Sequence, residues 1–98
     1  MKEQAAIEMD FARARAASNK LEEMASAYIR IIKTNEDIKE ELISRWKDEN
    51  SNLFMSKYNY IDEKLMNYAK QLKRVAETVN KIAENVYRTE MEALEVIE

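Results

Sequence analysis

The chain has 98 residues, and none of them is Gly, Pro, Cys or His. These absences argue against folds built on tight turns, and against Gly-rich phosphate loops, disulfides, the usual zinc sites and triads that need His or Cys. With 16 basic and 19 acidic residues and a net charge of -3, the composition also argues against a nucleic-acid-binding protein. We therefore expect one all-α domain over residues 1–98 that binds no nucleic acid, metal or cofactor and is not an enzyme.

The first predicted element is a helix over about residues 4–45. Its apolar residues recur every three or four positions, as in an amphipathic helix. Two registers overlap: Ile7, Phe11, Ala14, Ser18, Leu21, Ala25, Tyr28 and Ile32 form the first, and Met24, Tyr28, Ile31, Asn35, Ile38, Leu42 and Trp46 form the second. Thr34-Asn35-Glu36-Asp37 resembles a capping box, so either a continuous helix or a register shift near residues 33–37 fits. The polar Asn35 on the second face suggests, as a hypothesis, pairing with a different chain.

A turn is predicted at about residues 47–50, inside the only cluster of turn-type residues, 45–52. Asp and Asn tolerate the left-handed backbone conformation better than most other non-Gly residues. Asn50 or Ser51 can then cap the following helix through its side-chain oxygen. Trp46, the single Trp, stands just before this turn. We expect it either to close the turn end of a bundle as a core residue or to be exposed and functional.

The second predicted helix covers about residues 51–95. Its apolar positions alternate steps of four and three residues, which is the heptad pattern of a helix interface. These positions, called the predicted seam below, are Phe54, Tyr58, Ile61, Leu65, Tyr68, Leu72, Val75, Val79 and Ile82. Leu53, Ala69, Ala76 and Ala83 flank the seam and widen its apolar stripe.

The short connection makes the two helices antiparallel neighbours, so the fold class expected is an antiparallel two-helix hairpin. A single hairpin leaves part of each broad apolar stripe exposed, and such a surface usually marks an interface. We therefore expect pairing with a second copy or with a related helical hairpin chain to make a four-helix bundle.

The two ends of the sequence suggest how the chain is handled in the cell. The N-terminal residues lack the apolar run of a signal peptide, and no segment approaches the ~20 apolar residues that span a bilayer. We expect a chain made in the cytoplasm without a signal peptide and not inserted in a membrane. Residues 90–98 contain four Glu and no basic residue, which opposes the helix dipole at a C-terminus. This predicts a frayed acidic tail, either a recognition handle or an ordinary chain end.

The residues around the turn resemble the WXG family, the early-secreted-antigen-like proteins of bacterial type VII secretion systems. Trp46-Lys47-Asp48 is similar to the Trp-x-Gly motif of that family, with Asp48 in place of Gly. Leu42 one helical turn before the Trp, Phe54 eight residues after it and the predicted seam also resemble the family pattern. The resemblance covers about residues 5–90.

The resemblance implies a secreted helical dimer that acts by binding other proteins. A second role that it implies is a partner chain, which pairs with the N-terminal helices of a larger secreted toxin and targets it to the secretion ATPase. The family's secretion signal near the end of the second helix is matched loosely by Val86, Tyr87, Glu90, Ala93 and Ile97. The alternative reading of the same heptads is an intracellular structural or adaptor coiled coil unrelated to secretion.

Overall fold

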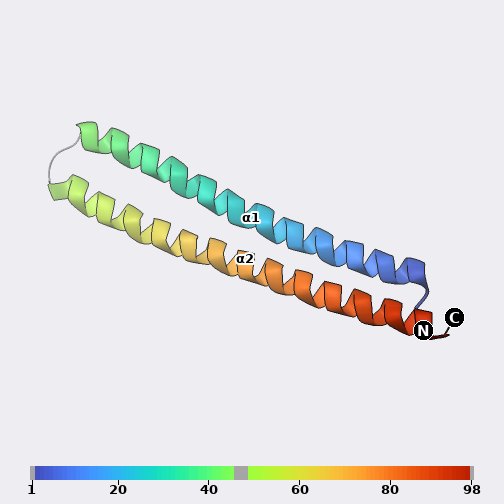
Figure 1. Cartoon of the computed structure of the whole chain (residues 1–98). Helices are drawn as coiled ribbons and strands as arrows, with labels where there is room; N and C mark the ends of the chain where they lie inside the picture. Colours follow the sequence, from blue (N-terminus) through green and yellow to red (C-terminus); the bar gives the residue numbers. More distant parts are fainter. Residues whose placement is uncertain (1, 46–48, 98) are drawn as a thin grey trace. The chain divides into compact units, whose positions relative to one another are not determined.

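The structure is a computed structural model that describes residues 2–45 and 49–97. These residues form two helices, α1 (Gln4–Arg45) and α2 (Glu49–Ile97), and no strand (Figure 1). The predicted all-α class is confirmed. The chain divides into two compact units, each of which contains part of both helices. Unit 1 combines α1 up to Glu23 with α2 from Lys73, and unit 2 is Met24–Leu72.

The bounds of the helices lie close to those expected. α1 is uninterrupted through residues 33–37, as the continuous alternative requires. α2 begins at Glu49, two residues before the expected start, so Glu49 and Asn50 belong to the helix and not to the turn. α2 continues to Ile97 although its last turn holds no basic residue, and fraying of that end stays a prediction.

Unit 1 is held together by small side chains on facing helices. Ser18 is 0% exposed and its Oγ donates a hydrogen bond to the carbonyl oxygen of Ala76, at 3.1 Å. Toward the chain ends, the rings of Phe11 and Tyr87 pack with their centroids 4.8 Å apart. The two contacts run in opposite sequence directions, so the helices of unit 1 are antiparallel. Because Ser and Ala fill the centre, the two backbones approach closely.

Unit 2 has a mixed interior. Ala25, Ile32 and Ala69 are buried, and the rings of Tyr28 and Tyr68 lie 6.4 Å apart between centroids. Lys39 lies 15 residues after Met24, the first residue of the unit. It is also buried and contacts α2. The helices of unit 2 are antiparallel as well, since later positions of α1 meet earlier positions of α2.

On α1, the first of the two predicted registers forms the contact with α2 and continues without a break. The buried and half-buried positions of this register and its continuation are Ile7, Phe11, Ala14, Ser18, Leu21, Ala25, Tyr28, Ile32, Asn35, Lys39 and Leu42; Ala27 and Ile29, on either side of Tyr28, are half-buried as well. The second register departs from this at Met24, Ile31 and Ile38, which are 49%, 47% and 38% exposed. Each of these three residues immediately precedes a buried position, so each lies at the flank of the helix contact.

On α2, the predicted seam is divided between two surfaces. Tyr58, Leu65, Leu72 and Val79 are half-buried against α1, and Phe54 is half-buried with its ring centroid 4.6 Å from that of Tyr58. The exposed members are Ile61, Tyr68, Val75 and Ile82, each about half accessible. The flanking alanines Ala69, Ala76 and Ala83 take the buried positions instead. Close approach of the backbones favours small residues at the centre and displaces the large ones to the flank.

Candidate interaction surfaces

A polar cluster lies inside unit 2, where the heptad pattern would place apolar side chains. Lys39 Nζ of α1 donates hydrogen bonds to Asn59 Oδ1 at 2.8 Å and to Asp62 Oδ2 at 2.5 Å, both on α2. Asn35 Nδ2 donates to the other carboxylate oxygen of Asp62, Oδ1, at 2.9 Å. Both oxygens of the carboxylate are thus satisfied from α1, and the four residues cross-link the two helices.

The ion pair in this cluster is largely removed from water. The Lys39 and Asp62 side chains are only 10% and 12% exposed. Burial by itself raises the pKa of the Asp62 carboxyl. The hydrogen bonds from Lys39 and Asn35, together with the Lys39 charge, outweigh that effect, so the pKa lies below its ordinary value of 3.8. The ionised carboxylate is therefore the form that unit 2 stabilises.

Sequence reasoning missed this cluster, although a signal was present. Asn35 and Lys39 continue the four-and-three spacing of the first α1 register, and Asp62 occupies the same pattern on α2, between Tyr58 and Leu65. Polar residues at matching heptad positions of two antiparallel helices indicate a paired buried site. The Asn35 amide is engaged within its own chain, so pairing with a different chain is not what satisfies that donor.

A row of exposed apolar side chains follows one side of unit 2. Met24, Ile31 and Ile38 are seven residues apart on α1, and Ile61 and Tyr68 are seven apart on α2; we call these five residues the apolar row. All are between 38% and 51% exposed. On both helices they occupy the same heptad position, the one before a buried or half-buried residue. In an antiparallel pair that position falls on the same side of both helices, so the row is one continuous surface.

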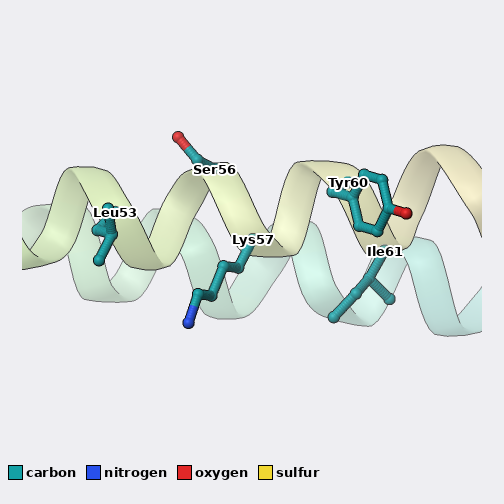
Figure 2. A pocket seen from close by; sticks show the side chains of 5 residues that line it. All are labelled: Leu53, Ser56, Lys57, Tyr60 and Ile61. Atoms are coloured by element: carbon teal, nitrogen blue, oxygen red, sulfur yellow. The ribbon is translucent and has the colours of Figure 1, made fainter.

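A shallow groove on α2 extends this surface. It has a volume of about 400 Å³ and is lined by Leu53, Ser56, Lys57, Tyr60 and Ile61 (Figure 2). Leu53 and Tyr60 are 63% and 59% exposed. Figure 2 shows Lys57 and Ile61 extending from one edge of the helix and Ser56 from the other. Lys64 Nζ lies over the Tyr60 ring, 4.8 Å from its centroid. The groove thus offers an apolar floor with ammonium groups beside it.

At the end of unit 1, a small ion cluster joins the two helices. Lys2 Nζ lies 2.8 Å from Asp10 Oδ2 and 3.2 Å from Glu90 Oε1. The hydrogen bond to Asp10 is the largest cause of the raised pKa of Lys2, and the hydrogen bond to Glu90 is the second. The hydrogen bond from Lys2 likewise lowers the pKa of Asp10. Lys2, Ile7, Glu90 and Ala93 surround a hollow of about 230 Å³.

The residues of the predicted secretion signal do not share one exposed face. Tyr87 packs on Phe11, and Glu90 pairs with Lys2. Val86 is 46% exposed, and Ala93 is exposed too. Ile97 is the last residue of α2, and its side chain lies outside the described residues. Of the described side chains in this set, only Val86 and Ala93 are exposed to a receptor.

Another exposed stripe runs along the last turns of α2. It consists of Ile82, Val86, Ala93 and Val96, which recur at helical spacing on one face; we call it the C-terminal stripe. Ile82 and Val96 are 57% and 86% exposed. The acidic residues Glu92 and Glu95 are exposed in the same turns. This segment therefore joins apolar side chains with carboxylates.

The predicted turn motif, Trp46 and Asp48, lies outside the described residues. Among residues 2–45 and 49–97, no group of three or more His, Cys, Asp or Glu is placed to hold a metal ion. Over the same residues, neither helix is long and apolar enough to cross a membrane. The chain matches no protein-family model, no curated protein and no solved structure.

Proposed function

We propose that this chain acts by binding another helical protein, and that it is a WXG-like small protein of a bacterial type VII secretion system. The observation that carries the binding role is the apolar row. Five large apolar side chains at heptad spacing are each more than a third exposed. Their exposure to water is unfavourable, and a helical partner can cover them. Covering it with a second hairpin gives a four-helix bundle.

The secretion role rests on the resemblance around Trp46-Lys47-Asp48 together with the two long helices. In this proposal the chain is exported as a dimer, or it pairs with the N-terminal helices of a larger toxin and targets that toxin to the secretion ATPase. The end of α2 serves as the handle that the export machinery recognises. Its acidic residues Glu92 and Glu95 are exposed in the single chain, which supports recognition of this end by a basic receptor surface when no second copy covers it.

The second candidate is an intracellular structural or adaptor coiled coil. It uses the same apolar row, because helical pairing alone accounts for heptad spacing. The two candidates differ in what they need from the rest of the chain. An adaptor is indifferent to Trp46 and to residues 86–98, whereas a secreted protein is not.

Light scattering on the purified chain tests the binding role, which requires a self-associated species or a stable complex with a helical partner. Export from the native host tests the secretion role. We expect Glu90→Gln to reduce export while circular dichroism stays unchanged, and Glu84→Gln, an exposed Glu on the same helix, to leave export intact. Lys2→Gln is the companion control, because it breaks the Glu90 ion pair without altering the carboxylate. Absence of the wild-type chain from the medium contradicts the secretion role and favours the adaptor.

A further inference from the structure

We propose that the groove on unit 2 receives the C-terminal stripe of a second copy of this chain. This inference rests on the self-pairing proposed above and names the two surfaces that meet. The groove is the one lined by Leu53, Ser56, Lys57, Tyr60 and Ile61. The stripe is Ile82, Val86, Ala93 and Val96, all of which are exposed in unit 1.

The side chains of the C-terminal stripe can fit between those that line the groove. The groove is shallow and open, between side chains one helical turn apart. The stripe presents three branched aliphatic side chains and one Ala, which are three, four or seven residues apart on one helix. Such side chains fit between the residues of a facing helix, as knobs fit into holes. The free energy of association comes from burying Leu53, Tyr60 and Val96, because each is more than half exposed in the single chain.

The charges of the two surfaces are complementary, and this selects the occupant. Lys57 borders the groove and Lys64 lies over Tyr60, so the groove margin is basic. Glu92 and Glu95 lie in the turns that carry the stripe, and residues 89–98 contain no basic residue. An acidic amphipathic helix suits a basic apolar groove, and opposite charges at the rim orient the approach. The chain itself supplies such a helix, with the right spacing of apolar residues.

Every copy carries both surfaces, which has a consequence for assembly. In a two-fold dimer each copy gives its stripe to the other and receives a stripe in return, so the contact forms twice and the assembly closes. A variant that reverses the charge of the groove can therefore be rescued by a variant that reverses the charge of the stripe. In the mixed dimer, one contact joins two reversed surfaces and the other joins two unaltered ones.

The test measures the dissociation constant of fluorescently labelled chains. Lys57→Glu with Lys64→Glu is expected to raise the self-dissociation constant by at least about tenfold, and Glu92→Lys with Glu95→Lys is expected to do the same. Mixing the two variants is expected to restore binding to within about threefold of the wild type. The control, Lys33→Glu with Lys70→Glu, changes net charge equally at two exposed positions of unit 2 away from the groove, and it should leave self-association nearly unchanged.

The outcomes separate this inference from the proposal beneath it. A wild-type chain that stays monomeric overturns self-pairing and the inference together. A wild-type chain that self-associates while both charge variants still bind normally overturns only the groove assignment. Failure of the mixture to recover, or an equal loss in the control, also overturns it.

A second readout keeps the test valid if a charge variant fails to fold. The chain has no Cys, so a disulfide can form only between introduced residues. Lys57→Cys chains mixed with Glu92→Cys chains are expected to give a cross-linked heterodimer under mild oxidation. Lys70→Cys mixed with Glu92→Cys should give much less. Equal yields from the two mixtures overturn the proposed contact.

Discussion

Replacing Asp62 by Ala is expected to destabilise unit 2 far more than removing an exposed acid elsewhere in the chain. The substitution takes away the carboxylate that accepts hydrogen bonds from Lys39 and Asn35. Lys39 is left as a charged group with a side chain only 10% exposed and with Asn59 as its remaining partner. A buried charge without its counter-charge is one of the few changes that cost several kcal/mol.

The magnitude follows from the burial. Breaking a buried ion pair by removing one partner costs about 3–5 kcal/mol. The Lys39 side chain keeps some contact with water and its hydrogen bond to Asn59. The expected loss of unfolding free energy is therefore near the lower end of this range, at about 3 kcal/mol. The matched control is Glu84→Ala, because the Glu84 side chain is 57% exposed and its Oε1 lies 4.0 Å from Arg15 Nη1. Exposed pairs of that kind contribute about 0–1 kcal/mol.

Urea unfolding at fixed chain concentration, followed by circular dichroism, measures these free energies; the concentration is fixed because the self-association proposed above would add stability. The double substitution Lys39→Met with Asp62→Leu is a second comparison. It removes both charges and is expected to be within about 1 kcal/mol of the wild type, or more stable. An Asp62→Ala loss no larger than that of Glu84→Ala refutes the reasoning. So does a double variant that loses as much as the single variant.

Three further predictions concern pH and the packing of unit 1. Because the pKa of Asp62 is lowered in the folded chain, its contribution to stability is present above the ordinary value of 3.8 and is lost as the pH falls through the lower folded value. Unfolding titrations should therefore show a flatter acid limb for Asp62→Asn than for the wild type. Ser18→Leu is expected to cost at least about 1–3 kcal/mol by overpacking against Ala76, whereas Ser18→Ala should cost only about 1 kcal/mol; similar losses contradict the close approach seen there. Phe11→Ala should cost about 2 kcal/mol, less than for a fully buried Phe, and the near-ultraviolet signal of Tyr87 should change with it. An unchanged signal contradicts the ring contact.

The two helices were predictable because their signal is repeated along the whole chain. Heptad spacing over α1 and α2, with no Gly or Pro to stop either helix, leaves little freedom in the class of fold. The helix bounds were less predictable. Glu49 and Asn50 lie in the cluster of turn-type residues, and the sequence pattern does not say whether they end the turn or begin the helix.

The division of the predicted seam could not be read from periodicity alone. Ile61 and Ala69 both fall on a broad apolar stripe, and spacing does not say which of them faces the other helix. The choice depends on how closely the backbones approach, and that depends on Ser18, Ala25 and Ala76 together. The polar cluster could not be predicted from the sequence for a related reason. A Lys at a heptad position is read as solvated until the Asp opposite it is known.

The use of Ala and Ser between the helices has a consequence for how this molecule can change over generations. Small side chains such as Ser18, Ala25 and Ala76 lie at the centre of the helix contacts, and the large side chains of the apolar row lie at their flank. Substitutions at distant, independent positions act additively, so the apolar row can vary while folding is preserved. A duplicated copy could acquire a new partner through a few changes at Ile31, Ile38, Ile61 or Tyr68. Recognition can diverge in such a lineage while the hairpin itself is inherited intact.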